Sequence, residues 1–242
     1  MKLGILICDH VQTHLQSEFG DYQDMFISTI NKANCDIKNL KLSFYDVESG
    51  QYPTDINDCD VYMSTGSQYS VYENQAWITQ LLAFIQSLYI AKKPFVGICF
   101  GHQLIAQALG GLVEKSVKGW GVGVTTSKVI KKQSWMKPDL NSVNLIVSHQ
   151  DQVIKLPKDT EVLMGNQFCP YYMIQIDKHI LGIQGHPEFS RNYSKALMLS
   201  RKDRIPKQVL DKGVVSLNKI PDDLIIMQWL LCFFNRQWPV KL

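Results

Sequence analysis

The sequence lacks an excess of either sign of charge. Only 19% of its 242 residues are charged, and 25 Lys and Arg residues against 22 Asp and Glu residues leave a net charge of +3. A protein dedicated to nucleic-acid binding normally carries a strongly basic face, so this balance argues against a nucleic-acid partner. Disorder is disfavoured too, because 45% of the residues are apolar and can form a core.

No hydrophobic run is long enough to cross a membrane. The longest apolar stretch, residues 224–234, is interrupted by Gln228 and has about half of the roughly 20 residues that a membrane-spanning helix needs. The apolar run at the N-terminus meets Asp9 and His10 too early for a secretory signal. We therefore expect a cytoplasmic protein without membrane contact, with residues 224–234 buried inside the domain rather than at a dimer face.

Cysteines are few and scattered, and no C-x-x-C pair occurs. We therefore expect reduced thiols rather than a disulfide framework or a zinc site. His10 and His14 have the i, i+4 spacing of a metal-binding pair, but no third ligand follows them, and Gln12 and Gln16 favour a polar loop. The six cysteines are Cys8, Cys35, Cys59, Cys99, Cys169 and Cys232.

The apolar pattern changes along the chain. Short apolar runs and amphipathic helical spacing alternate as far as Gly111, which is typical of a parallel sheet covered by helices, and shorter alternating strands follow. The sequence predicts one α/β domain over residues 1–242, with a doubly wound, mostly parallel sheet (flavodoxin-like) and additional mixed β strands. Strands are expected at residues 3–8, 60–64, 94–98, 120–130, 143–148, 161–167, 172–176 and 180–184. Helices are expected at residues 21–33, 72–89 and 104–109, and a last helix is expected to open at residues 221–223.

A G-x-C-x-G motif places Cys99 between a predicted strand and a predicted helix. It is the cysteine counterpart of the nucleophile elbow, a sharp turn that strains the nucleophile's backbone and requires small neighbours such as Gly97 and Gly101. We expect the turn to expose the sulfur at a helix N-terminus, which favours the thiolate. The N–H of Phe100 could then stabilise an oxyanion. Taken alone, the motif is equally consistent with a buried structural cysteine.

His186 and Glu188 are candidates for a general base and its orienting acid. They flank Pro187, which disfavours a helix, and residues two apart in an extended segment face the same side. An isolated H-P-E sequence is also consistent with a surface loop. His102 is a second candidate base, but no acid lies near it in the sequence, and we expect it to pack behind the turn.

Together with two further segments, these motifs resemble the class-I glutamine amidotransferases of the Cys-His-Glu type. The resemblance is strongest to the stand-alone branch akin to the amidotransferase domain of GMP synthase. Residues 64–68 (S-T-G-S-Q) resemble the family's oxyanion loop, and residues 148–153 (S-H-Q-D-Q-V) resemble the segment beside the substrate's α-amino and α-carboxylate groups. The four blocks occur in the family's order.

The resemblance implies a role for each matched residue. It implies that Cys99 attacks the γ-carbonyl to form a thioester, that His186 transfers the proton, and that Glu188 orients His186. No metal or organic cofactor is implied. The oxyanion loop departs from the common pattern, because Ser67 and Gln68 stand where Gly-Pro or a second glycine is usual. The implied oxyanion donors are the N–H groups of Gly66 and Phe100, and the implied substrate-binding residues are Gln103, Ser148, His149 and Gln150.

Three functions follow from this resemblance. The first is an amidotransferase-like enzyme that cleaves the γ-glutamyl amide of glutamine and releases glutamate and ammonia for an unidentified acceptor. Since no phosphate-binding loop is present, the acceptor would belong to a separate synthase subunit. The second is a free-standing γ-glutamyl peptidase or hydrolase acting on γ-glutamyl peptides or conjugates. The third is an inactive binding or regulatory module, which the intact Cys99, His186 and Glu188 disfavour.

Overall fold

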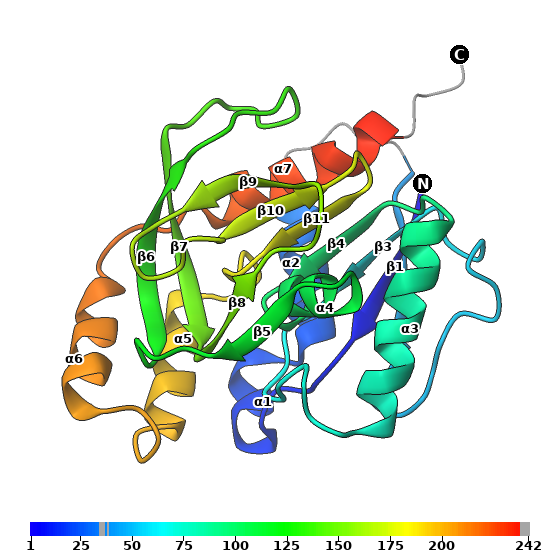
Figure 1. The fold of residues 1–242 in the computed structure, drawn as a ribbon. Helices are drawn as coiled ribbons and strands as arrows, with labels where there is room; N and C mark the ends of the chain where they lie inside the picture. Colours follow the sequence, from blue (N-terminus) through cyan, green and yellow to red (C-terminus); the bar gives the residue numbers. More distant parts are fainter. Residues whose placement is uncertain (34–36, 38, 238–242) are drawn as a thin grey trace.

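A large mixed sheet organises the chain (Figure 1). The computed structural model describes residues 1–33, 37 and 39–237, and within them nine strands form the sheet in the order β2-β1-β3-β4-β11-β10-β9-β6-β7. β5 and β8 form a separate two-stranded ribbon. The strands are β1 (Lys2–Ile7), β2 (Lys41–Asp46), β3 (Val61–Ser64), β4 (Phe95–Ile98), β5 (Leu112–Lys115), β6 (Gly121–Val129), β7 (Ser142–His149), β8 (Asp151–Lys155), β9 (Thr160–Gly165), β10 (Met173–Ile176) and β11 (Ile180–Ile183).

The sheet has a parallel half and an antiparallel half. From β2 to β11 all neighbouring strands are parallel, and from β11 to β7 all are antiparallel. The predicted doubly wound sheet with additional mixed strands is thereby confirmed. In the parallel half, Ser64 pairs with Gly97 and Ile98 pairs with Ile183. The segments that follow these three strands therefore leave the sheet side by side, at the edge where open α/β sheets bind ligands.

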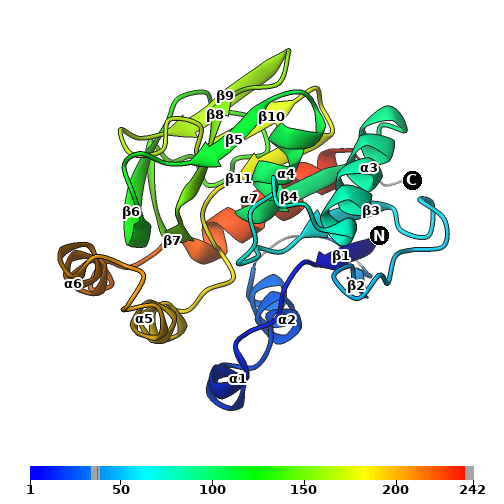
Figure 2. The ribbon, with the colours of Figure 1, turned by 60° about the horizontal axis from the view of Figure 1, so that its bottom comes forward.

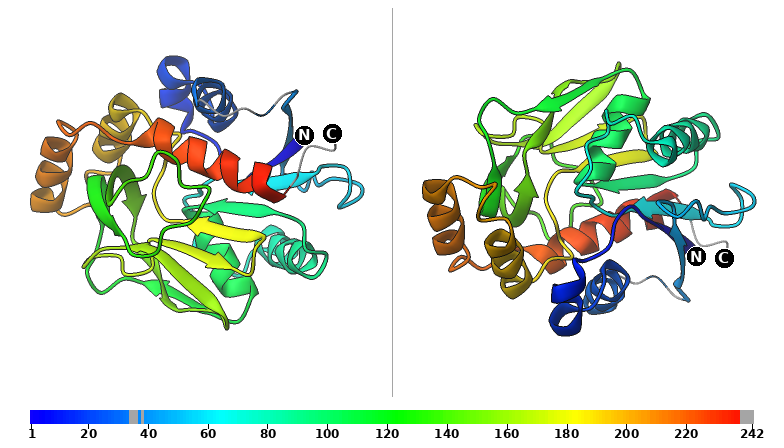
Figure 3. Two further views of the ribbon diagram at one scale, coloured as in Figure 1. Left: turned by 90° about the horizontal axis from the view of Figure 1, so that it is seen from above. Right: turned by 90° about the horizontal axis from the view of Figure 1, so that it is seen from below.

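Helices cover both faces of the sheet (Figure 3). α2 (Tyr22–Lys32) and α7 (Asp223–Gln237) lie on one face, and α3 (Ala76–Ile90) and α4 (Phe100–Ala108) lie on the other. The apolar stretch 224–234 falls in α7, where Trp229, Leu230 and Phe233 are fully buried. Burial within the fold, as expected, explains why this helix is apolar almost all round.

α5 (Arg191–Ser200) and α6 (Lys207–Ser216) pack against β6 and β7 at the antiparallel end (Figure 2). Gly123 of β6 has a φ of +80° and lies directly against the backbone of Gly213 in α6. A side chain at either position would separate the helix from the sheet, so the two glycines allow this close approach.

The hydrophobic pattern of the sequence does not predict several short elements. The polar loop expected around Gln12 and Gln16 is wrong, because a seven-residue helix, α1 (Thr13–Phe19), begins there and buries only Leu15. One buried position is too few to produce a helical period. β2 is a half-buried edge strand, and the ribbon strands β5 and β8 are partly exposed, so these three lack a clear alternation as well.

The described cysteines Cys8, Cys59, Cys99, Cys169 and Cys232 form no disulfide with one another, and Cys35 lies outside the described residues. Within the part of the chain that the structure describes, no helix combines the length and the apolar character needed to span a bilayer.

Candidate active site

Cys99 occupies a strained turn between β4 and α4. Its φ of 52° and ψ of −98° are unusual for a residue with a side chain. Its N–H donates to the carbonyl of Ile183 at 2.8 Å, which ties the turn to β11. A Cβ atom on Gly97 would clash with the backbone of Gly101, so the tight turn requires glycine there. The predicted strained strand-to-helix turn is present.

The sulfur is less open than the sequence suggests. We expected the turn to expose it, but Cys99 is only 3% exposed. It lies at a cavity of about 160 Å³ whose walls are the loop after β3, the end of β7 and the turn after α5. These walls come from distant parts of the chain, which is why the motif alone does not show that they cover the turn.

His186 and Glu188 form a buried pair beside Cys99. Their Nδ1 and Oε1 atoms are 2.7 Å apart, and their side chains are 4% and 0% exposed. Because a carboxylate accepts, Nδ1 carries the proton, and Nε2 has no hydrogen-bond partner among the described residues. Gly66 lies against both neighbours, since a Cβ atom built on it would be 2.8 Å from Cε1 of His186 and 3.5 Å from Cβ of Cys99. The turn at Cys99, the segment that carries His186 and Glu188, and the loop that carries Gly66 therefore meet at one point.

Charge around His186 favours its protonated form. Burial by itself lowers the pKa of His186, but the adjacent Cys99 sulfur and the Glu188 carboxylate outweigh burial and raise that pKa. The ring also stacks on Phe189, with centroids 3.9 Å apart. His186 is thus held in one orientation, and its surroundings favour the positively charged ring.

His102 has a different environment. It is fully buried and lies against Gly182 of β11. Burial lowers the pKa of His102 to about 3, so its ring is neutral at physiological pH. It does not border the cavity that holds Cys99.

A chain of amide hydrogen bonds ends at the Cys99 sulfur. Gln103 Nε2 donates to the carbonyl of Asp151 at 3.0 Å and to Oε1 of Gln184 at 3.2 Å, and Gln184 Nε2 donates to Sγ of Cys99 at 3.4 Å. A backbone carbonyl can only accept, so Asp151 fixes the orientation of the Gln103 amide, and Gln103 in turn fixes that of Gln184. The sulfur therefore always faces an N–H donor.

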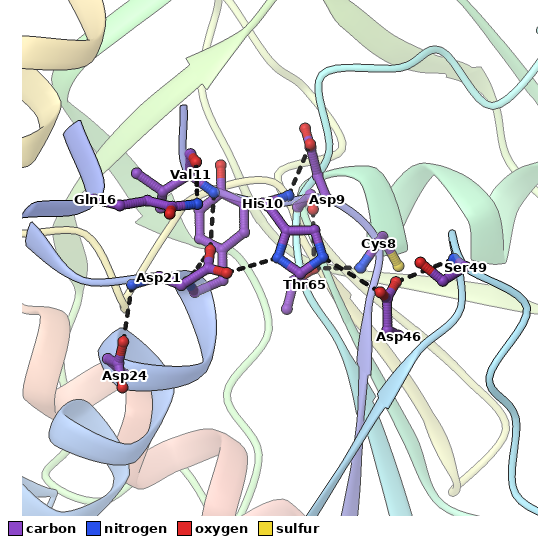
Figure 4. A network of polar contacts seen from close by, with 12 residues as sticks. Cys8, Asp9, His10, Val11, Gln16, Asp21, Asp24, Asp46, Ser49 and Thr65 are labelled. Atoms are coloured by element: carbon purple, nitrogen blue, oxygen red, sulfur yellow. Dashed lines mark hydrogen bonds and ion pairs between the residues drawn. The ribbon is translucent and has the colours of Figure 1, made fainter. Parts of the chain in front are cut away.

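Residues 64–68, the segment expected to form the oxyanion loop, are tied to the end of β1. The N–H of Cys8 donates to Oγ1 of Thr65 at 2.9 Å, and that hydroxyl donates to the carbonyl of Gly66 at 2.9 Å (Figure 4 shows Cys8 and Thr65). Asp9 accepts hydrogen bonds from the backbone N–H of Gln68 at 2.7 Å and from its side chain at 3.3 Å. Burial raises the pKa of Asp9, and these donors oppose that rise. The loop thus has its own anchors although Ser67 and Gln68 replace the usual residues.

His10 belongs to this anchoring region. Its ring lies between two carboxylates, 2.6 Å from Asp21 and 3.4 Å from Asp46 (Figure 4). The hydrogen bond to Asp21 is the main cause that raises the pKa of His10. In the described part of the chain, no group of three or more His, Cys, Asp or Glu side chains has the arrangement of a metal site.

The expected substrate-binding residues line the same cavity as Cys99. Gln103, Ser148, His149 and Gln150 all border it. His149 Nδ1 donates to the carbonyl of Asp151 at 3.0 Å, and burial lowers the pKa of His149 to about 4. The Asp151 carboxylate accepts from the hydroxyls of Ser70 and Tyr72, at 2.5 Å and 3.1 Å. These bonds hold the loop after β3 against β8.

Three residues near the cavity were not anticipated from the sequence. Gln184 comes two positions before His186 at the end of a parallel strand, and Asp9 follows β1 at the same edge of the sheet. Both positions could have been suspected, because ligand sites collect at this edge. Arg201 reaches the cavity from the turn after α5, and no local pattern marks it.

Known proteins resemble this chain along most of its length. The family model described as "Glutamine amidotransferase class-I" matches residues 18–203. Gamma-glutamyl peptidase 3 of Arabidopsis thaliana is 28% identical, over 94% of this chain and 93% of its own length. One of the subunits of the glutamine-hydrolysing GMP synthase of Sulfolobus acidocaldarius is 29% identical, over 63% of this chain and 80% of its own length. In fold, the crystal structure of a glutamine amidotransferase from Thermotoga maritima has a TM-score of 0.72 at 17% identity and covers 97% of both chains.

Proposed function

Because the chain belongs to the class-I glutamine amidotransferase family, we propose that it hydrolyses γ-glutamyl amide bonds through a thioester at Cys99. The observation that carries the proposal is the meeting of three features: the strained Cys99 turn, the His186–Glu188 pair, and Gly66 packed against both Cys99 and His186. A nucleophile, an oriented base and candidate oxyanion donors are the groups that acyl transfer requires.

In the first half of the reaction, the Cys99 sulfur attacks the γ-carbonyl carbon while its proton resides on His186. The N–H groups of Gly66 and Phe100 stabilise the oxyanion of the tetrahedral intermediate. The N–H of Phe100 suits this role because the first N–H groups of a helix have no partner within the helix. His186 then donates its proton to the leaving nitrogen, the C–N bond breaks, and a γ-glutamyl thioester and a free amine result.

In the second half, His186 removes a proton from a water molecule, and the hydroxide attacks the thioester carbon. The C–S bond breaks, glutamate leaves, and Cys99 is regenerated as the thiolate paired with protonated His186. Glu188 keeps the imidazole oriented and stabilises its charge in both halves. Both halves use the same three side chains, and water is the only co-reactant.

For the leaving group, we favour an amino acid or peptide amine. The supporting observation is the length of the alignment with the relatives named gamma-glutamyl peptidases. One of them aligns over 94% of this chain and 93% of its own length. The anchored oxyanion loop also suits an enzyme that works without a partner to order it.

The second candidate is glutamine hydrolysis that supplies ammonia to a separate synthase subunit. Relatives named as subunits of a glutamine-hydrolysing GMP synthase favour it, at 29% and 30% identity over 63% of this chain. In that case the leaving group is ammonia, and the free chain would be slow until a partner binds.

Hydrolysis assays on the purified chain separate these functions. The protein is incubated without ATP, with glutamine and separately with glutathione, and glutamate is measured in both reactions and ammonia in the first. Fast cleavage of glutathione with slow release of ammonia supports the peptidase. Slow ammonia release without peptide cleavage supports the synthase-dependent enzyme. If neither substrate reacts and Cys99 is inert to a γ-glutamyl-like electrophile, the chain is a binding module and the proposal is wrong.

A further inference from the structure

Two arginines from one turn border the cavity at Cys99. Arg201 and Arg204 follow α5, and both line the cavity. Nη1 of Arg201 donates to Oγ of Ser148 at 3.0 Å, which holds this guanidinium against the wall. The guanidinium carbon of Arg204 lies 5.6 Å from the centroid of the Trp120 ring, a cation–π geometry. The half-buried Arg201 is thus fixed at the cavity wall, and the exposed Arg204 lies beside Trp120 at its rim.

Among the described residues, the two guanidinium groups have no anionic partner. In the described part of the chain, neither Arg201 nor Arg204 forms an ion pair with a carboxylate. Nε of Arg201 is shielded from solvent and makes no hydrogen bond among the described residues. A buried donor without a partner is costly unless a ligand satisfies it. The arrangement is that of a site that receives an anion.

The carboxylates of the same cavity are already engaged. Asp151 accepts from Ser70 and Tyr72, and Glu73 accepts the backbone N–H of Ser70 at 2.8 Å. These acids belong to the wall formed by β8 and the loop after β3. The cations that line the cavity are Arg201 and Arg204 at the turn after α5 and Lys115 of β5, and among the described residues none of them forms an ion pair with these acids.

Arg201 lies on the His186 side of the cavity. It also lines a smaller hollow together with Ser67, His186 and Phe189, whereas Gln103, Glu73 and Asp151 do not border that hollow. The general acid must reach the nitrogen that leaves. The part of a substrate beyond the scissile bond would therefore extend toward His186 and Arg201.

We propose that Arg201, assisted by Arg204, binds a carboxylate on the leaving group, so that the site selects γ-glutamyl peptides with a free C-terminal carboxylate over glutamine. The inference rests on the proposed γ-glutamyl hydrolysis and deepens it. A guanidinium fork matches the two oxygens of a carboxylate. Glutamine releases ammonia, which carries no carboxylate, so it gains nothing from this contact.

The test compares glutathione with its C-terminal amide, which differs only in the carboxylate. For the wild-type protein, kcat/KM should be higher for glutathione by about 10- to 100-fold, the range expected for a charge-assisted hydrogen bond. Arg201→Gln should bring the ratio of the two substrates close to one, and Arg201→Lys should keep part of the preference. Arg191→Gln is the matched control, because Arg191 also comes from α5 but donates to the carbonyl of Leu217. It should leave the ratio as in the wild type.

Two outcomes would overturn the inference: a wild-type protein that does not distinguish the two substrates, or an Arg201→Gln loss equal for both. An equal loss would mean that Arg201 supports Ser148 or the γ-glutamyl half. If neither substrate is cleaved, hydrolysis itself is the failed proposal. The carboxylate site is then tested by calorimetric titration of the Cys99→Ala protein with both compounds. Tighter binding of glutathione that Arg201→Gln removes supports the site, and equal binding refutes it.

Discussion

Replacement of Gln184 by methionine would remove the N–H donor that faces the Cys99 sulfur at 3.4 Å. Methionine has a similar length and no hydrogen-bond donor, so it fills the space of a side chain that is 0% exposed. It also leaves Gln103 Nε2 bonded to the carbonyl of Asp151 alone. The perturbation therefore acts mainly on the stability of the thiolate.

The size of the effect on activity follows from the hydrogen bond that Gln184 donates to the Cys99 sulfur. A hydrogen bond to a charged group contributes about 1.5–3 kcal/mol, and a sulfur acceptor at 3.4 Å belongs at the lower end of that range. Since about 1.4 kcal/mol corresponds to a tenfold change in rate, kcat/KM should fall by about tenfold.

Alkylation with iodoacetamide measures the reactivity of the sulfur directly, and its rate should fall as well. The rate at the peptide containing Cys99 is followed by mass spectrometry, because the other cysteines must be separated from the signal. Gln175→Leu is a suitable control, since Gln175 is a buried glutamine of β10 that donates to the carbonyl of Asp177 and does not line the Cys99 cavity. It should leave the rate of Cys99 alkylation unchanged.

The reasoning is refuted if Gln184→Met alkylates Cys99 at the wild-type rate. It is also refuted if the urea midpoint of unfolding falls together with the activity, because such a loss indicates damage to the fold rather than to the sulfur. Slower alkylation with an unchanged urea midpoint is the result that a direct effect on the sulfur explains.

Four further outcomes are expected. Cys99→Ala should abolish turnover with little change in the urea midpoint of unfolding, and activity within about tenfold of wild type would contradict the assigned nucleophile. His186→Ala should lower kcat by about 10²–10⁴-fold while His102→Met keeps most activity; the opposite order would make His102 the base. The Glu188 carboxylate raises the pKa of His186, so Glu188→Gln should lower that pKa and move the alkaline limb of the kcat/KM profile to lower pH; an unmoved limb would exclude this coupling. Gly97→Ala should reduce the free energy of unfolding by roughly 1–3 kcal/mol or more, because its Cβ meets the backbone of Gly101; a wild-type urea curve would show that the turn can relax.

Much of the fold could be predicted because its signals are local. A run such as residues 94–98 is apolar throughout because β4 is buried on both faces, and α7 is apolar because it is covered on nearly all sides. α1 and β2 were missed because burial on one side of a short element leaves too few positions for a period. These failures reflect weak amphipathicity. α1 and β2 lie outside the strands that carry the site, whereas β8, which also lacks a clear alternation, supplies the Asp151 carbonyl that binds Gln103.

Part of the candidate site could likewise be predicted from the sequence, and part could not. The turn at Cys99 follows from neighbouring glycines, and the contact between His186 and Glu188 follows from their spacing in an extended segment, so both could be inferred from a few consecutive residues. The amide chain through Gln103 and Gln184 could not, because its orientation depends on a carbonyl of β8.

Local geometry is determined by the sequence over a few residues, since backbone sterics and side-chain periodicity act between near neighbours. The sequence by itself therefore determined the order of the main strands and helices, the strained turn, and the side chains that face one another within one segment. Only the tertiary structure decided that the sulfur is buried, that Asp9 anchors the loop after β3 at Gln68, and that Arg201 faces the cavity from 102 positions beyond Cys99. These contacts depend on which strands pair and which loops then meet, and pairing is decided by the burial of the whole sheet rather than by any one segment.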